Sequence, residues 1–210
     1  MRGMFISFEG IEGTGKTTQA RLLADYLKEK GYRVIQTMEP GGTTISMKIR
    51  ELLLSMESRG MDHVVELLLY NAARVQHIKE VINPALERGD IVITDRFSDS
   101  TVAYQGYARG IDLQLIDSLD MIATKNLRPD ITILFDIDVR TGLARNKNLG
   151  KNDRLELEDI SFHEKVRKGF LQIAAGEPGR IKVVDCAESL DGVHQKVVKI
   201  ISDFLKEQGH

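Results

Sequence analysis

Short apolar runs alternate with amphipathic helical patterns along the whole chain. Five of the runs have the length and the β-branched content that are typical of buried strands. The stretches between them repeat apolar residues every three or four positions, as helices that pack on one side do. This alternation predicts βαβ units, and therefore one α/β domain over residues 1–210, with a five-stranded parallel sheet and helices on both faces. The predicted strands are residues 4–8, 33–37, 91–95, 131–135 and 181–184.

Three other segments refine this picture. Residues 64–73 are apolar on more than one helical face, so we expect burial from several sides, by the core or by a second subunit. Residues 145–154 are polar, basic and glycine-containing, and they interrupt two helical patterns, which indicates a mobile lid over about 145–155. The closing helical pattern predicts a helix that packs one side on the sheet through Val193, Val197, Ile200, Ile201 and Phe204.

Composition limits the partners and the location of the protein. The 210 residues are 42% apolar and 29% charged, which suits a globular domain with a substantial core. A formal net charge of −2 argues against broad nucleic-acid binding. The one cysteine, Cys186, excludes an intrachain disulfide and suits a reducing compartment. The first strand leaves no room for a signal peptide and no apolar stretch is long enough to span a bilayer, so we expect no membrane contact and a cytoplasmic location.

Residues 10–17 read GIEGTGKT, a complete GxxxxGKT phosphate-binding loop between a predicted strand and a predicted helix. The glycines let backbone N–H groups curl around a polyphosphate, Lys16 reaches its outer phosphates, and the Thr17 hydroxyl can bind Mg²⁺. A glycine-rich turn without a ligand is the alternative, but all four fixed positions in this context favour a nucleoside triphosphate site. Its predicted residues are Gly10, Ile11, Glu12, Gly13, Thr14, Gly15, Lys16, Thr17 and Thr18.

Polar residues also follow the second and third predicted strands. Glu39 begins the sequence EPGGT after one strand, and Asp95-Arg96-Phe97 lies where the other ends. In open parallel sheets, ligands bind beyond the carboxyl ends of the strands. We therefore expect these residues and the phosphate loop to form one site.

Seven segments of the chain read FEGIEGTGKTTQA (8–20), EPGGT (39–43), IRELLL (49–54), LLLYNAAR (67–74), DRFSDSTVAYQG (95–106), DRLE (153–156) and VRKGFL (166–171). Together they resemble the bacterial thymidylate kinase family. The resemblance implies the three-layer fold of P-loop NTPases, a homodimer, and transfer of the γ-phosphoryl group of ATP to dTMP with Mg²⁺. A phosphate monoester is already anionic, so this reaction needs cations and no general base. We accordingly assign no role to the five histidines.

The cations expected near the phosphates are Lys16, Arg96 and Arg50. By resemblance, Arg96 binds the dTMP phosphate through its planar guanidinium, and Arg50 is a second contact, although an exposed helix arginine is the alternative for Arg50. Asp95 is expected to hold Mg²⁺ through water or to position the acceptor. Its competitor for the metal, Asp136, is interpreted as a helix cap.

The base and the sugar of dTMP are assigned to residues on two helical patterns. Tyr70 and Arg74 are four residues apart, so a base could stack on Tyr70 while Arg74 donates to a thymine carbonyl, or the two could form only a surface cation–π pair. Thr101 and Gln105 share the same spacing and can read the base edge.

The resemblance assigns two further acceptor contacts: Tyr104 crowds the 2′ position, and Glu12 points at the 3′-hydroxyl. Glu39 follows the second predicted strand, and we expect it to organise water on Mg²⁺ or acceptor contacts. Relatives usually have an arginine where this chain has Met38, which weakens the basis for Glu39.

The predicted lid supplies the remaining cations. Some relatives carry an arginine in the phosphate loop, and this chain has none there. The hypothesis is that Arg154 or Lys151 completes the clamp on the transferring phosphoryl group and that Arg145 lies over adenine, in the manner of family members with a basic lid. A solvated charge run without a function is the alternative reading of this segment.

Three other functions fit the sequence less well. A signalling GTPase lacks support, because Ser98 stands where its DxxG motif needs glycine and Leu149 follows Asn148 where NKxD needs aspartate. A non-catalytic nucleotide-binding protein would not need Lys16, Thr17, Asp95 and Arg96 together. A deoxynucleoside kinase is the closest rival, with Glu39 as a base toward a neutral 5′-hydroxyl.

Overall fold

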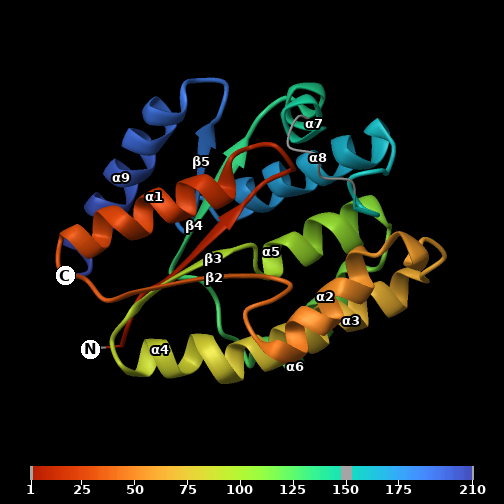
Figure 1. Ribbon diagram of the computed structural model, residues 1–210, viewed down its shortest axis with the longest axis horizontal. Helices are drawn as coiled ribbons and strands as arrows, with labels where there is room; N and C mark the ends of the chain where they lie inside the picture. The colour runs from red at the N-terminus through yellow and green to blue at the C-terminus, as the bar shows by residue number, and fades with distance from the viewer. Residues whose placement is uncertain (1, 148–152, 210) are drawn as a thin grey trace.

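The sheet has five parallel strands in the order β2-β3-β1-β4-β5 (Figure 1). The structure is a computed structural model that describes residues 2–147 and 153–209. Each strand begins and ends within one residue of its predicted bounds, and the α/β class with a parallel sheet is confirmed. The strands are β1 (Phe5–Glu9), β2 (Val34–Met38), β3 (Ile91–Asp95), β4 (Ile131–Asp136) and β5 (Ile181–Asp185).

Alternate residues of the central strands enter two separate apolar clusters. Ile6 of β1 and Ile93 of β3 belong to the larger cluster, whereas Phe5 and Val92 pack in a smaller one with Phe97. Since successive strand residues point to opposite faces, both faces of the sheet are buried, as a parallel sheet requires. This burial fixes the strand ends that carry the site.

Two helices lie side by side against the sheet, α1 (Lys16–Glu29) and α9 (Leu190–Glu207) (Figure 1). The closing helix buries Val193, Val197 and Ile201 as its pattern predicted. The other helical elements are α2 (Thr44–Leu54), α3 (His63–His77), α4 (Asn83–Glu87), α5 (Ser98–Thr101), α6 (Leu113–Thr124), α7 (Val139–Lys147), α8 (Ile160–Gly176), the 3₁₀ helix η1 (Met56–Ser58) and the π-helices η2 (Ile78–Ile82) and η3 (Val102–Ala108).

Helix α3 corrects one expectation. It buries Leu67 and Ala73, but Val64, Val65 and Leu68 remain about half exposed. The core of one chain therefore does not cover all the apolar faces of residues 64–73, and core burial alone is the wrong explanation of this pattern. Within the described residues, no helix combines the length and apolar content needed to cross a bilayer.

Candidate active site

The phosphate loop connects the end of β1 to the start of α1. Gly13 and Gly15 have φ angles of 74° and 88°, in the left-handed region that favours glycine. A Cβ on Gly13 would lie 1.9 Å from the Gly142 carbonyl oxygen, so this position also requires the close approach of two backbones. The backbone N–H groups at the start of α1 and the dipole of that helix favour a bound phosphate.

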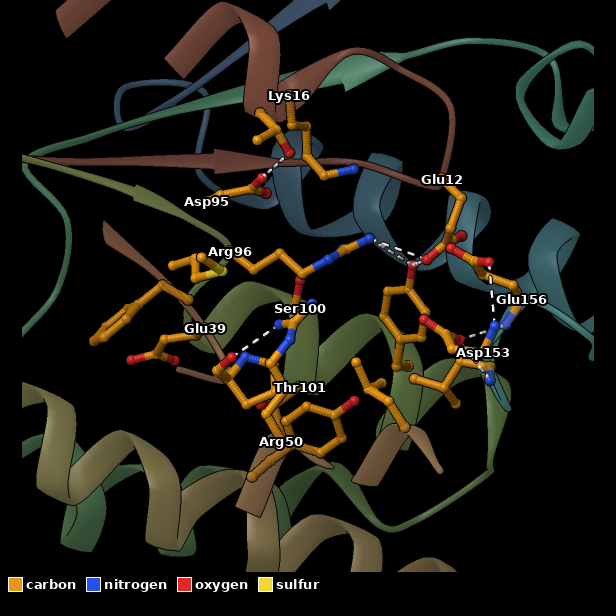
Figure 2. A pocket seen from close by; sticks show the side chains of 18 of the residues that line it. Glu12, Lys16, Glu39, Arg50, Asp95, Arg96, Ser100, Thr101, Asp153 and Glu156 are labelled. Carbon is orange, nitrogen blue, oxygen red and sulfur yellow. Dashed lines mark hydrogen bonds and ion pairs between the residues drawn. The ribbon is translucent and has the colours of Figure 1, made fainter. Parts of the chain in front are cut away.

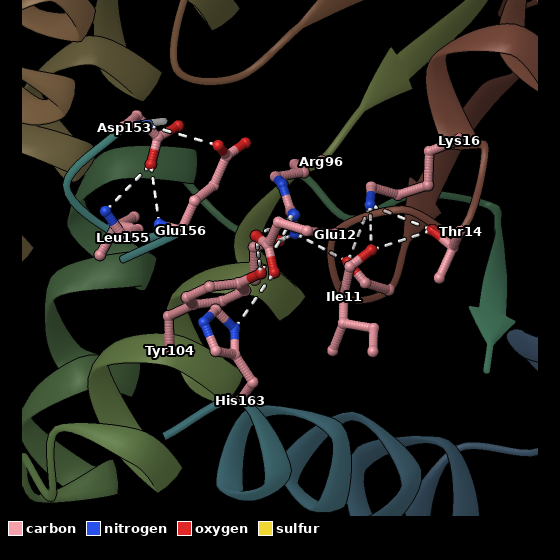
Figure 3. Close-up of polar contacts among 12 residues, drawn as sticks. Ile11, Glu12, Thr14, Lys16, Arg96, Tyr104, Asp153, Leu155, Glu156 and His163 are labelled. Carbon is pink, nitrogen blue, oxygen red and sulfur yellow. Dashed lines mark hydrogen bonds and ion pairs between the residues drawn. The ribbon is translucent and has the colours of Figure 1, made fainter. Parts of the chain in front are cut away.

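Lys16 lies buried inside this loop. Its ammonium donates to the carbonyl oxygens of Gly10 and Ile11 at 3.0 and 2.7 Å, and to the Thr14 hydroxyl at 3.3 Å (Figure 3). Burial, with a smaller contribution from the positive charge of Arg96, lowers the pKa of Lys16 to about 8. The loop therefore holds a compact cation whose charged form a bound polyphosphate would stabilise.

Thr17 and Asp95 bring a hydroxyl and a carboxylate together where α1 begins and β3 ends. The Thr17 hydroxyl donates to the Asp95 Oδ2 atom at 2.5 Å. Both are hard oxygen ligands of the kind that Mg²⁺ prefers when phosphates and water complete its shell. No cluster of three or more His, Cys, Asp or Glu side chains suited to a metal occurs in the described part of the chain. These two residues fit a Mg²⁺ ion that is bound mainly by nucleotide phosphates and water, and not a metal site made of protein ligands alone.

Arg96 stands in a strained backbone conformation at the end of β3, with φ of 74°. Its guanidinium donates to Glu12 and Tyr104, both at 3.0 Å, to the Gly10 carbonyl oxygen at 3.0 Å and to the Ser100 hydroxyl at 3.1 Å. Burial alone would lower the pKa of Arg96, but Tyr104 and the carboxylates of Glu12 and Asp95 raise it, so the side chain stays charged. The fold therefore fixes a permanent cation next to the phosphate loop.

Glu9, the last residue of β1, holds this strained turn and is absent from the sequence prediction. Its carboxyl group is fully buried and accepts hydrogen bonds from the Phe97 backbone N–H at 2.7 Å and from the Ser100 hydroxyl at 2.6 Å. Burial and the neighbouring Asp99 charge raise the pKa of Glu9 to about 8. In the sequence, Glu9 is marked by its place directly after the apolar run of β1 and inside the segment 8–20.

Replacing Glu9 by glutamine is expected to stabilise the protein more at pH 8 than at pH 5. The pKa of Glu9 is raised from 4.5 in the unfolded chain to about 8 in the folded chain, so ionisation favours unfolding increasingly across that window. Glutamine keeps an oxygen that can accept from the Phe97 N–H, and its NH₂ group would donate to the Ser100 hydroxyl, which now donates to Glu9, but the amide cannot ionise. Tm for Glu9→Gln should exceed the Tm of the parent by about 5 °C more at pH 8 than at pH 5. The exposed Glu29→Gln is the control, and an equal difference at both pH values would contradict the prediction.

Glu12 meets Tyr104 and a buried histidine beside Arg96. The Tyr104 hydroxyl donates to Glu12 at 2.5 Å, and the His163 Nδ1 atom lies 3.4 Å from the other carboxylate oxygen (Figure 3). Burial alone would raise the pKa of Glu12, but the close His163 and Arg96 lower it far below its ordinary value. Assigning no role to any histidine overlooked this contact, because His163 comes from α8, far along the chain.

Glu39 is buried in an ion-paired cluster after β2. It accepts from Arg74 at 2.8 Å and lies 3.0 Å from the Nδ1 atom of His77. Burial alone would raise the pKa of Glu39, but Arg74 and His77 together lower it. A carboxylate with a lowered pKa is a poor general base, which weighs against the proton abstraction that a deoxynucleoside kinase would ask of it.

Two facing helical segments bring the predicted base-binding residues together. Arg74 of α3 is 1% exposed and donates to the Thr101 hydroxyl at 2.9 Å, while Gln105 of η3 donates to Glu66 of α3 at 2.9 Å. Tyr70 lies one helical turn from both Glu66 and Arg74 on the same helix. The spacing of four residues on α3, and on the consecutive elements α5 and η3, therefore places polar groups along one shared line. We call this line the seam; it consists of Glu66, Tyr70, Arg74, Thr101 and Gln105.

A cavity of about 720 Å³ joins the phosphate loop to this seam. Figure 2 shows Arg96 between Lys16 and Asp95 on one side and Thr101 and Arg50 on the other. Gly10, Ile11 and Thr14 lie in the loop but do not line the cavity. The predicted residues that line it are Glu12, Gly13, Gly15, Lys16, Thr17, Thr18, Glu39, Arg50, Tyr70, Arg74, Asp95, Arg96, Thr101, Tyr104, Gln105 and Arg145.

The lid residues do not all reach this cavity. Arg154 is buried, with its Nε atom 3.0 Å from the Leu53 carbonyl oxygen and its Nη2 atom 2.5 Å from Glu66. In this arrangement it does not complete a clamp over the phosphate loop. Lys151 falls outside the described residues. Arg145 lines the cavity and donates to the Cys186 carbonyl oxygen at 3.0 Å.

Asp136 is not a helix cap, which corrects that interpretation. Both of its carboxylate oxygens accept from Arg167 of α8, at 2.7 and 2.8 Å. Asp138, directly before α7, makes the capping contact instead: its carboxylate accepts a hydrogen bond from the Thr141 backbone N–H at 3.1 Å. The choice of Asp95 over Asp136 as the metal-side aspartate remains a prediction, and Asp95 is the one that contacts Thr17.

Fold and site together define a P-loop kinase that transfers a phosphoryl group to a small nucleotide-like acceptor. The sequence model of the thymidylate kinase family matches residues 8–197. A thymidylate kinase of a Sulfurihydrogenibium species is 50% identical over 98% of both chains, and one of Syntrophotalea carbinolica is 49% identical over 98% of both. The crystal structure of thymidylate kinase from Ehrlichia chaffeensis superimposes with a TM-score of 0.80 at 40% identity, over 96% of this chain and 99% of that one.

This chain belongs to the thymidylate kinase family. The predicted family, the P-loop fold and the assignment as an enzyme are therefore confirmed. The deoxynucleoside kinase alternative is not favoured.

Proposed function

We propose that the chain transfers the γ-phosphoryl group of ATP to dTMP, giving dTDP and ADP, with Mg²⁺ and the residue roles given below. Family membership supports the reaction. The observation that carries the roles is the position of Arg96 between the phosphate loop and the polar seam of α3 and η3, inside one cavity (Figure 2). A cation in this position attracts two anionic phosphate groups that approach it from opposite sides, and so aligns the donor and acceptor for in-line transfer.

Lys16 and the loop backbone bind the β- and γ-phosphates of ATP, and Thr17 and Asp95 hold Mg²⁺. When bound, the metal neutralises phosphate charge and orients the phosphoryl group. Arg96 binds the dTMP phosphate, and Arg50, whose guanidinium donates to the Pro40 carbonyl oxygen at 2.8 Å, lies on the same cavity wall. The acceptor oxygen is ionised already, so these groups position charge and move no proton.

The nucleoside part of dTMP lies along the seam in this proposal. Tyr70 stacks on the base, while Arg74, Thr101 and Gln105 meet its polar edge. Glu12 accepts from the 3′-hydroxyl, and Tyr104, held against Glu12 and Arg96, crowds the 2′ position. All six side chains line the cavity, which is the support for this placement.

Glu39 acts on the acceptor through Arg74: their ion pair of 2.8 Å holds the Arg74 guanidinium at the base end of the cavity. The lid roles stay predictions: Arg145 over adenine, and Lys151 or Arg154 on the transferring phosphoryl group. For Arg154, that role requires its guanidinium to leave Glu66.

The homodimer is supported by apolar side chains on neighbouring helices. Val64, Val65 and Leu68 of α3 are 45–48% exposed, and Met121 and Ile122 of α6 are 48% and 73% exposed. Helices α3 and α6 pack against each other, so a second copy could cover both. Sedimentation at the mass of one chain would contradict the dimer. We keep the cytoplasmic location as a proposal, on the single buried cysteine.

A coupled assay of ADP formation tests the acceptor. The expected kcat/KM for dTMP exceeds that for thymidine by at least about a thousandfold, because thymidine has no phosphate for Arg96 and would need a base. The comparison uses both acceptors at the same ATP and Mg²⁺ concentrations. A preference for thymidine would overturn the proposal.

A further inference from the structure

Glu66 is a fully buried carboxylate that the proposed reaction does not use. It lies on α3, four residues before Tyr70, and faces η3 across the seam. Its oxygens meet three groups: the Gln105 amide nitrogen at 2.9 Å, two atoms of Arg109 at 3.3 Å each, and Arg154 at 2.5 Å. Glu66 therefore joins the cavity lining to buried cations beyond it.

This contact fixes the orientation of the Gln105 amide. An ionised carboxylate can only accept hydrogen bonds, so it selects the NH₂ end of the amide and turns the carbonyl oxygen away. Burial alone would raise the pKa of Glu66, but Gln105 and Arg109 lower it, so the acceptor-only form persists at neutral pH. Because Gln105 lines the cavity while it is 1% exposed, its amide has little freedom to turn over.

The two polar ends of the seam then differ in hydrogen-bonding character. Arg74 can only donate, whereas the side-chain carbonyl oxygen of Gln105 can only accept. A 4-oxo pyrimidine presents the complementary pair, a carbonyl oxygen at C4 beside an N–H at N3. A 4-amino pyrimidine presents the reverse pair, which would leave buried groups of the site unpaired.

We propose that Glu66 is a specificity-determining positioning residue, which orients Gln105 so that the site accepts 4-oxo pyrimidine monophosphates and rejects 4-amino ones. The inference rests on the proposed function, since it takes the seam as the base site. Arg109, which also pairs with Glu158 at 2.7 Å, keeps the Glu66 carboxylate charged and in place whether or not Arg154 stays bound to it.

The test compares kcat/KM for dTMP, dUMP and dCMP in the full-length protein and in Glu66→Gln. The new amide can donate or accept, so Gln105 is no longer held in one orientation. The ratio of dTMP to dCMP is expected to fall at least about tenfold, the effect of one hydrogen bond mismatch. The ratio of dTMP to dUMP should stay within about twofold, because both bases present the same edge at N3 and C4.

Arg109→Met is the matched control. It disturbs the same buried ion cluster but leaves Glu66 as the acceptor for Gln105, so the ratio of dTMP to dCMP should not change. If Arg109→Met lowered this ratio as much as Glu66→Gln, the effect would be general loosening and the inference would be wrong. An unchanged ratio in Glu66→Gln would also overturn it.

Glu66→Asp decides the matter if Glu66→Gln does not fold. Aspartate keeps the negative charge for both arginines, but its carboxylate is one methylene further from Gln105. The dTMP to dCMP ratio should fall at least about threefold, and an unchanged ratio overturns the inference. Failure of the proposed function would look different, because the parent protein would then phosphorylate neither dTMP nor dUMP.

Discussion

Replacing Arg96 by methionine is expected to lower kcat/KM for dTMP about a thousandfold while the KM for ATP changes less than about threefold. Arg96 is the cation between the phosphate loop and the seam, and its guanidinium already fits four oxygen acceptors. Methionine retains much of the length and apolar stem of the side chain but removes the charge and every donor. The loss therefore falls on the acceptor phosphate and on charge that develops during transfer.

Steady-state kinetics with each substrate varied in turn measures this effect. Arg167→Met is the matched control, because Arg167 is likewise ion-paired with a carboxylate, that of Asp136, yet does not line the cavity. It should stay within about twofold of the parent. Arg96→Lys should recover less than about a tenth of the lost kcat/KM, since an ammonium cannot grip two phosphate oxygens with a planar fork. Retention of dTMP turnover by Arg96→Met would remove Arg96 from the acceptor site.

The sequence predicted those features that local patterns determine. Strand bounds came out within one residue, because β1, β3, β4 and β5 are short, mostly apolar runs that end at a carboxylate residue, and β2 is directly followed by one, Glu39. The phosphate loop was predicted because its glycines, Lys16 and Thr17 are contiguous. One rule, that ligands bind beyond the carboxyl ends of parallel strands, was enough to predict that Glu39, Asp95 and Arg96 share one site.

The sequence could not predict how buried charges pair. Glu9 meets the backbone of Phe97, and Arg154 meets Glu66, across 88 positions in each case. A charged side chain pairs with the partners that the finished fold brings near. The position of Arg154 in the basic lid segment suggests a phosphate contact, but in the structure Arg154 contacts Leu53 and Glu66 instead. The same reason explains why the sequence suggests a helix cap at Asp136, although its partner Arg167 comes from α8.

Replacing Lys16 by methionine is expected to lower kcat about a thousandfold at saturating ATP and dTMP. The ammonium lies within 3.0 Å of the Gly10 and Ile11 carbonyl oxygens, where it can turn toward the outer phosphates of a bound nucleotide. Lys16→Arg should not restore activity, because the loop encloses a compact ammonium and has no room for a planar guanidinium. Calorimetry should show dTMP affinity within about threefold of the parent, since the acceptor meets Arg96 instead.

Proton uptake provides a second, independent measurement on the same variant. The pKa of Lys16 is lowered to about 8 by burial and by Arg96, so roughly half of the free protein carries this proton at pH 8. A bound triphosphate raises the pKa of Lys16, because its negative charge favours the ammonium. ATP binding at pH 8 should therefore take up about half a proton, measured by calorimetry in buffers of different ionisation enthalpy, and this uptake should vanish in Lys16→Met. Equal uptake in the parent and the variant would mean that Lys16 does not face the phosphates, and the thousandfold loss would then need another cause.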